Sequence, residues 1–331
     1  AVKLLDLAPI LVQIATQHLE EVQEAAAAAA AGRESGGRNT AAAPATPAAA
    51  AAGSPPSIDD VTTIVFDWGG VLTSLSPLSS IRDFEASHNL PKGYISIAIH
   101  ASDDIPPGGL FQRLERGELP LDDSFLRAWE VELTSPKSHQ AYAAVAERLS
   151  GLKAQDLPPS FFPRHLDTRS LLRYIIKASV TIDPAMLAAV RSLRAAGFRT
   201  AVLTNDFRFA PGVFSSAHEG EAELWARLEG MERVLNDSSL FDVVVSSAAT
   251  RARKPEWRVY EVLCEALGLP MSKANHILFL DDIGRNLKAA KVLGIQTVLV
   301  TEENRGEVVA ALEGLARSKA GGGRLERGSR L

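Results

Sequence analysis

The chain has 331 residues, 46% of them hydrophobic and 23% charged, and a formal net charge of −5. These values fit a globular protein of about two domains, and the acidic balance, without a basic stripe interleaved with aromatics, argues against a nucleic-acid partner. No apolar run reaches the roughly 18 residues that span a membrane. The single cysteine, Cys264, excludes a disulfide framework and is expected to lie buried in a helix.

Residues 1–58 are expected to lie outside the globular part. Apolar residues at helical spacing predict an amphipathic helix over 3–24, built on Leu4, Leu7, Leu11 and Ile14. The stretch that follows is rich in Ala, Pro, Gly and Ser, has little to bury, and predicts a disordered linker. The helix is interpreted as one that binds a partner or another part of the chain.

Five short apolar runs, each ending in a turn, predict buried parallel strands over residues 61–67, 198–205, 241–247, 276–282 and 295–300. Helical patterns that end at glycines lie between them, at 184–197, 256–268 and 284–294. This alternation predicts an α/β fold with a Rossmann-like parallel sheet flanked by helices. The core is assigned to residues 59–75 and 181–316, and residues 317–331 to a flexible tail.

Residues 76–180, here called the cap, interrupt the alternation with helical patterns and no series of strands. We expect an inserted all-helical subdomain that covers the strand ends, selects the substrate and excludes water. Trp68 is expected to pack where cap and core meet. The cap acids Glu115, Glu118 and Asp123 are expected to form a solvated helix face.

Polar side chains gather where the predicted strands end. Asp67 follows the first strand, Thr204 and Asn205 the second, and Asp281 and Asp282 the fourth. Open parallel sheets bind ligands at the carboxyl ends of their strands, so these residues are expected to form one site.

The residue types at this site suit phosphate chemistry. A cluster of carboxylate oxygens suits Mg²⁺, and Asp67 has the chemistry of either a nucleophile or a metal ligand. Thr204 and Asn205 offer a hydroxyl and an amide to an anion. Lys254, in "RARKPEW", can neutralise a carboxylate and a phosphoryl oxygen together.

Four segments in this order resemble the signature of the haloacid dehalogenase superfamily of hydrolases: "FDWGGVLT", "VLTN", "RKPEWRVYEVL" and "FLDDIGRNLKAAKVLG". The insertion after the first segment is similar to the C1-type cap of that family. "LFQRLERGEL" and "FLDDIGRNLK" also resemble the phosphatase-like domain at the N-terminus of soluble epoxide hydrolase and of certain large acyl-CoA dehydrogenases.

The resemblance implies a role for each matching residue. Asp67 would be the nucleophile, Lys254 a catalytic and phosphate-binding residue, and Thr204 and Asn205 further phosphate ligands. Mg²⁺ would be held by Asp67, the Gly69 carbonyl, Asp281 and Asp282. Asn286 and Gly70 would support these groups.

Gly69 departs from the family pattern, because phosphatases of the family carry a second aspartate at this position that acts as general acid and base. Such catalysis contributes roughly 10²–10⁴-fold, so we expect slow turnover that favours good leaving groups. Asp206 is the nearest replacement acid in the sequence, and the substitution Gly69→Asp is expected to raise turnover on alkyl phosphates.

The sequence leaves three functions open. The first is a Mg²⁺-dependent phosphatase that forms an aspartyl-phosphate at Asp67 on a small phosphorylated metabolite. The second is a catalytically weak module of the same fold that binds a ligand or partner. The third is a metal-free haloacid dehalogenase, against which the Asp281–Asp282 pair argues.

The sequence ends with Ser329, Arg330 and Leu331, which is similar to the Ser-Lys-Leu peroxisomal address. If Leu331 is the true C-terminus, this ending predicts recognition by an import receptor and a location in the peroxisomal matrix. The alternative is a cytoplasmic location. Oligomeric state is not predicted.

Overall fold

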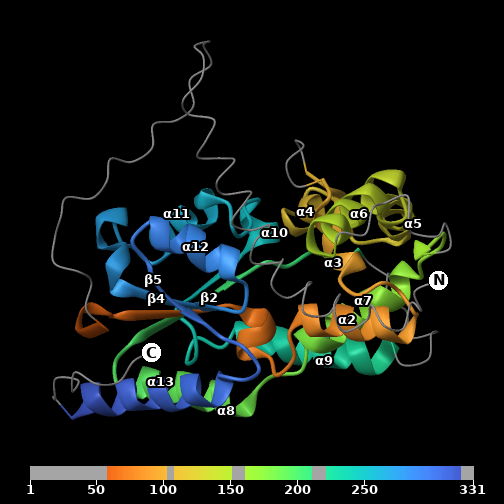
Figure 1. Cartoon of the computed structure of the whole chain (residues 1–331). Coiled ribbons are helices and arrows are strands. Elements are labelled where there is room, and N and C mark those ends of the chain that lie inside the picture. The colour runs from red at the N-terminus through yellow and green to blue at the C-terminus, as the bar shows by residue number, and fades with distance from the viewer. Residues whose placement is uncertain (1–57, 103–107, 151–160, 211–220, 322–331) are drawn as a thin grey trace, which may run out of the picture.

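The computed structural model describes residues 58–102, 108–150, 161–210 and 221–321. Within these ranges a sheet flanked by helices lies beside a second body made of helices (Figure 1). The predicted N-terminal helix, the linker and the Ser-Arg-Leu ending fall outside the described residues. No helix within the four ranges is long and apolar enough to cross a membrane.

Five parallel strands form one sheet in the order β3-β2-β1-β4-β5. They are β1 (Thr63–Phe66), β2 (Arg199–Thr204), β3 (Val243–Ser246), β4 (Ile277–Asp281) and β5 (Gln296–Leu299). All five lie inside the predicted segments, which confirms the α/β fold class. The central strand β1 pairs with β2 on one side and β4 on the other, so the residues that follow these three strands emerge side by side.

Helices cover both faces of the sheet (Figure 1). Ile64 and Phe66 of β1 pack with α8 (Pro184–Ala195) and α13 (Arg305–Ala320), whereas Val65 faces α11 (Trp257–Ala266) and α12 (Gly284–Val292). Cys264 of α11 is buried, as expected. Short helical turns η3 (Ile58–Asp60) and η7 (Met271–His276) precede β1 and β4.

The glycines predicted to stop helices do so. Gly197, Gly268 and Gly294 follow α8, α11 and α12 with φ of 85°, 64° and 87°, the left-handed conformation that a glycine adopts without a steric penalty. Helix α13 continues to Ala320, beyond residue 316 where the core was expected to end.

The described part of the helical body contains the helices α2 (Pro77–Ser87), α3 (Tyr94–His100), α4 (Leu110–Glu115), α5 (Asp123–Leu133), α6 (Pro136–Ser150) and α7 (Thr168–Ser179). Their buried apolar residues form one cluster, called the cap cluster. Helix α3 was not predicted, because its sequence YISIAIH alternates β-branched residues in the manner of a strand.

Helix α9 (Glu221–Leu235) lies along the seam between the two bodies. Leu228 is buried in the cap cluster, Val234 and Leu235 pack against the core, and Met231 touches both. The sequence assigned residues 181–316 to the core without predicting a helix at this place, whereas the side chains of α9 pack in both bodies. The proposed boundaries of core and cap otherwise stay a prediction.

Glu85 of α2 explains how α3 forms against its local propensity. Its two carboxylate oxygens accept hydrogen bonds of 2.7 Å from the backbone N–H groups of Gly93 and Ile95, at the start of α3. Glu85 is 1% exposed, and burial raises its pKa from 4.5 to about 7, against the two backbone hydrogen bonds and the positive charges of Arg82 and Lys92.

Glu85→Gln is therefore expected to remove a pH dependence of stability. The pKa of the folded state lies above the unfolded value of 4.5, so the contribution of Glu85 is full below pH 4.5 and is lost as pH rises through about 7. The loss reaches about 3 kcal/mol. Denaturant unfolding measured across this range should show the wild type losing stability relative to Glu85→Gln.

Glu223→Gln, at an exposed position of α9, is the control and should keep the wild-type pH profile. A constant difference between the wild type and Glu85→Gln over the whole range would contradict the prediction.

Candidate active site

The centre of the site is the side chain of Lys254, which is 1% exposed. Its Nζ lies 2.7 Å from Oδ1 of Asp67 and 2.8 Å from Oδ2 of Asp281, so it joins the residue after β1 to the last residue of β4. Burial by itself would lower the pKa of Lys254, but attraction to Asp281 and Asp67 outweighs it and raises the pKa. The ammonium therefore stays charged.

Asn205 holds the backbone of Lys254 in place. Its side-chain amide donates to the carbonyl oxygen of Lys254 at 3.1 Å and accepts from the backbone N–H of Lys254 at 2.8 Å. The amide expected to bind an anion is thus occupied in positioning the lysine. Thr204 is buried at the end of β2, where its hydroxyl makes one long hydrogen bond, of 3.4 Å, to the carbonyl oxygen of Asn205.

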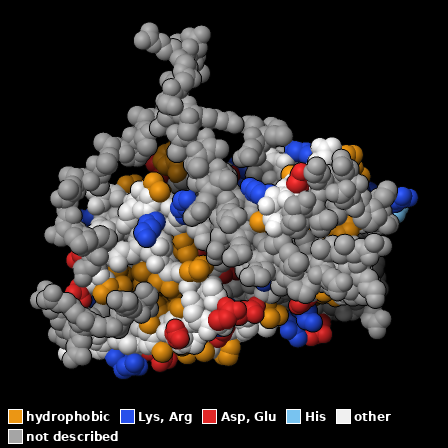
Figure 2. Space-filling model, viewed as in Figure 1, with side chains coloured by type: hydrophobic (Ala, Val, Ile, Leu, Met, Phe, Trp, Pro, Cys, Tyr) orange, Lys and Arg blue, Asp and Glu red, His pale blue; other side chains and the backbone are white. Residues whose placement is uncertain are grey.

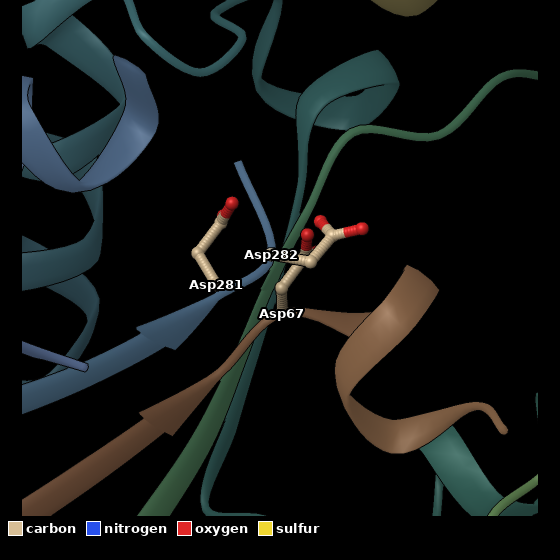
Figure 3. Close-up of side chains that lie close together, drawn as sticks. All are labelled: Asp67, Asp281 and Asp282. Atoms are coloured by element: carbon tan, nitrogen blue, oxygen red, sulfur yellow. The ribbon is translucent and has the colours of Figure 1, made fainter. Parts of the chain in front are cut away.

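Asp67, Asp281 and Asp282 form a cluster of carboxylates at the ends of β1 and β4 (Figure 3). Each offers an oxygen within 4.8 Å of the other two. Asp281 accepts from the backbone N–H of Ile283 at 2.8 Å and from the amide of Asn286 at 3.0 and 3.1 Å. Ser76, just before α2, donates to Asp282 at 2.6 Å and links the cluster to the cap.

With all three carboxylates ionised, the cluster would carry more negative charge than the Lys254 ammonium balances. Burial raises the pKa of Asp67 well above its ordinary value, and burial followed by repulsion from Asp281 raises that of Asp282 to about 7. Lys254 forms ion pairs with Asp67 and Asp281, whereas the Asp282 side chain accepts the hydrogen bond from Ser76.

A hard divalent cation fits this set of groups. The donors are all oxygens, as Mg²⁺ requires, and the surplus negative charge calls for a further cation. Oδ1 of Asn286 is a buried acceptor to which no described residue donates, so a metal-bound water would satisfy it.

The residues after Asp67 form a tight turn, η4 (Trp68–Leu72). The backbone N–H of Trp68 donates a hydrogen bond of 2.6 Å to Oδ1 of Asp67. Gly70 has a φ of 71°, and a Cβ there would lie 2.2 Å from Oδ2 of Asp282, so only glycine fits. A Cβ on Gly69 would lie 3.0 Å from Cγ of Pro77, the first residue of α2. The cap thus occupies the space beside the missing acid.

Asp206 does not replace that acid. Its Oδ1 accepts from the hydroxyl of Ser246 at 2.8 Å and from the backbone N–H of Ala248 at 3.0 Å, at the start of α10 (Ser247–Thr250). Its carboxylate therefore stabilises the N-terminus of a helix.

A buried ion pair joins the cap to the loop that carries Lys254. Oε2 of Glu115 in α4 lies 2.6 Å from Nε of Arg253, and the two residues are 8% and 6% exposed. The hydroxyl of Ser247 donates to the Glu115 carbonyl at 2.6 Å. The expectation of a solvated face is therefore wrong for Glu115, because that carboxylate faces the core; Glu118 and Asp123 are partly exposed.

The indole of Trp68 forms a second link across the same seam. Its Nε1 donates to the carbonyl oxygen of Ser179, at the end of α7, at 2.6 Å. The predicted position of Trp68 between cap and core is confirmed.

Sequence reasoning missed several residues of the site. Arg305, at the start of α13, donates to the carbonyl oxygens of Gly70 and Val71 at 2.7 and 3.0 Å, and nothing in its local sequence marks it. Arg253 directly precedes Lys254, and Glu115 lies in the segment "LFQRLERGEL". Their positions in these segments could therefore have marked both residues as candidates. The structure brings the predicted residues together, whereas their chemical roles stay predictions.

Comparisons with known proteins agree on one family. The model of the haloacid dehalogenase-like hydrolases matches residues 61–294. Acyl-CoA dehydrogenase family member 10 of Mus musculus is 27% identical over 237 residues, and bifunctional epoxide hydrolase 2 of Sus scrofa is 27% identical over 239 residues. Each alignment covers 72% of this chain but only 18% and 36%, respectively, of the relative.

A third relative is similar over nearly its whole length. Phosphatase MT3486 of Mycobacterium tuberculosis (strain CDC 1551 / Oshkosh) is 25% identical over 271 residues, which cover 80% of this chain and 99% of the relative.

Glu115→Ala is expected to destabilise the protein by about 3–5 kcal/mol, because it leaves Arg253 buried without a partner. Denaturant unfolding of the full chain measures the change. The control is Asp123→Ala, which breaks an ion pair with Arg169 at a side chain that is 64% exposed, and should cost at most about 1 kcal/mol. Equal, small losses in both variants would show that the buried pair does not hold the seam.

Proposed function

Because the chain belongs to the haloacid dehalogenase-like hydrolase family, we propose that it is a Mg²⁺-dependent phosphatase that forms an aspartyl-phosphate at Asp67. Its substrate would be a small phosphorylated metabolite. The observation that carries this proposal is the Lys254 ammonium, held between Asp67 and Asp281 at 2.7 and 2.8 Å. It balances the charge of the proposed nucleophile and would do the same for a phosphoryl oxygen bound beside Asp67.

Asp67 is arranged as a nucleophile. Its Oδ1 forms an ion pair with the Lys254 ammonium and accepts a hydrogen bond from the N–H of Trp68. No described residue donates to Oδ2, which leaves this oxygen available. In the proposed reaction a carboxylate oxygen bonds to phosphorus as the bond to the leaving oxygen breaks. Water then cleaves the acyl phosphate, which releases inorganic phosphate and restores Asp67. Thr204, buried at the end of β2, would bind the phosphoryl group through its hydroxyl.

Asp67, Asp281, Asp282 and the Gly69 carbonyl would hold the metal ion. Bound there, Mg²⁺ would neutralise charge on the phosphoryl oxygens and let an anionic nucleophile approach an anionic group. The similarity to a relative named as a phosphatase over 99% of its length supports this reaction class.

The missing acid restricts the leaving group. Without a proton donor at position 69, the leaving oxygen must depart as a stable anion, as from a sugar 1-phosphate, an acyl phosphate or an aryl phosphate. The same absence favours a second candidate function, a catalytically weak module that binds a phosphorylated ligand or a partner. The carboxylate cluster argues against the third, a metal-free dehalogenase.

Assays on p-nitrophenyl phosphate and a panel of phosphorylated metabolites, with and without Mg²⁺, test the first function. We expect Mg²⁺-dependent turnover in the wild type. In Asp67→Asn, which removes the nucleophile, we expect kcat to fall by at least about three orders of magnitude. Asp83→Asn, at an exposed position of α2, is the matched control and should keep wild-type kcat.

Three other results would change the assignment. Phosphate binding without turnover in the wild type would favour the binding module. Turnover that survives in Asp67→Asn would exclude an aspartyl-phosphate at that residue. Halide release from 2-haloacids in the absence of metal would refute both candidates.

The contact with Pro77 revises the expectation that Gly69→Asp alone raises turnover on alkyl phosphates, and restoring the acid is now expected to require two substitutions. Gly69→Asp by itself places its Cβ against Pro77 and should gain little on alkyl phosphates, whereas Gly69→Asp with Pro77→Ala should gain up to about 10²-fold in kcat/KM. The Pro77→Ala single variant is the control. No gain in the double variant would mean that the absent acid does not limit the rate.

A further inference from the structure

Thr73 lies directly behind the turn that follows Asp67 and is 0% exposed. Its Oγ1 accepts a hydrogen bond from the backbone N–H of Gly70 at 2.9 Å and donates to the carbonyl oxygen of Leu75 at 2.8 Å. Since the hydroxyl hydrogen is committed to Leu75, the oxygen presents its lone pairs to Gly70. The N–H of Gly70 therefore has a defined direction.

This hydrogen bond also fixes the carbonyl of Gly69. The C=O of Gly69 and the N–H of Gly70 belong to one planar trans peptide unit and point in opposite directions. With the N–H held on the Thr73 side, the Gly69 oxygen points away from Thr73. Gly70, the next residue, stands directly against Asp282, so the turn lies beside the carboxylate cluster.

The turn needs such external restraint, because Gly69 and Gly70 are the residues with the widest backbone freedom. Arg305 restrains the next two peptide units through the carbonyl oxygens of Gly70 and Val71, at 2.7 and 3.0 Å. The Arg305 guanidinium is itself held by Asp183 at 3.4 Å. Thr73 and Arg305 together fix three consecutive peptide units.

We propose that Thr73 is a positioning residue that aims the Gly69 carbonyl at the magnesium ion, with Arg305 as a second anchor of the same turn. At position 69 the chain has no side chain to offer, so the backbone oxygen is the ligand that this residue supplies. The inference rests on the proposed Mg²⁺-dependent function and gives Thr73, the last residue of the segment "FDWGGVLT", a role that the family resemblance did not imply.

Isothermal titration of the full chain with Mg²⁺ tests the role of Thr73 without relying on turnover. Thr73→Val keeps the shape and removes the hydroxyl, and we expect its affinity for Mg²⁺ to fall by about 10- to 100-fold, the range for residues that orient metal ligands. Thr73→Ser keeps the hydroxyl and should bind within about threefold of the wild type. Hydrogen exchange at the Gly70 amide should be faster in Thr73→Val than in Thr73→Ser.

Thr63→Val is a matched control. Thr63 is also fully buried, on β1, but its Oγ1 has no hydrogen-bond partner among the described residues. The same substitution there should leave both Mg²⁺ affinity and Gly70 exchange unchanged. If Thr73→Val does not fold, Arg305→Lys replaces it: lysine keeps the charge but loses the fork that reaches two carbonyls, and a weaker affinity for Mg²⁺ is again expected.

The outcomes separate this inference from the function on which it rests. Wild-type affinity in Thr73→Val, or in Arg305→Lys where that variant is used, would overturn the positioning role and leave the phosphatase assignment intact. A wild-type chain that binds no Mg²⁺ would overturn the metal-dependent function, and the positioning role with it.

Discussion

The site depends on keeping one ammonium charged at a position that water hardly reaches. Removing Lys254 from water costs several kilocalories per mole, and two carboxylates within 2.8 Å offset that cost. The two acids come from neighbouring parallel strands, so the sheet itself fixes the distance between them. Asn205, from the strand on the other side of β1, then fixes the backbone of the lysine through both halves of its amide.

The ion pairs of Lys254 with Asp67 and Asp281 leave the third carboxylate of the cluster, Asp282, without a positively charged partner among the described residues. The surrounding structure then determines which cation could bind there. A cluster of buried carboxylates is costly by itself, whereas it becomes a binding site when a cation of the right hardness is present. The glycines after Asp67 let the backbone approach Asp282 where any Cβ would collide. On the cap side, Ser76 donates to the same carboxylate. Core and cap therefore both shape the cluster.

The sheet and the motif residues could be predicted because their signals are local. Each strand is a short apolar run, and glycines follow α8, α11 and α12. The strand ends converge for geometric reasons that hold for parallel sheets generally. Helix α3 could not be predicted, because its own sequence favours a strand. Its start is stabilised by Glu85, which lies eight and ten residues before the two backbone N–H groups that it accepts from. Arg305 acts on a turn 235 residues earlier, and no local pattern encodes such a contact. The steric effect of Pro77 on position 69 could not be predicted either, because the two residues come into contact only once α2 packs against the turn.

Helix α9 has a consequence for how the protein loses its structure. Its residues complete the apolar packing of both bodies, and the Glu115–Arg253 pair crosses the same boundary without solvent to screen it. Melting either body first would expose apolar surface and a buried charge on the other. Cap and core therefore stabilise each other through these contacts. For the carboxylate cluster this means that its surroundings depend on both bodies, because unfolding of the cap would remove the Ser76 hydrogen bond to Asp282 and leave Arg253, next to Lys254, without the Glu115 carboxylate.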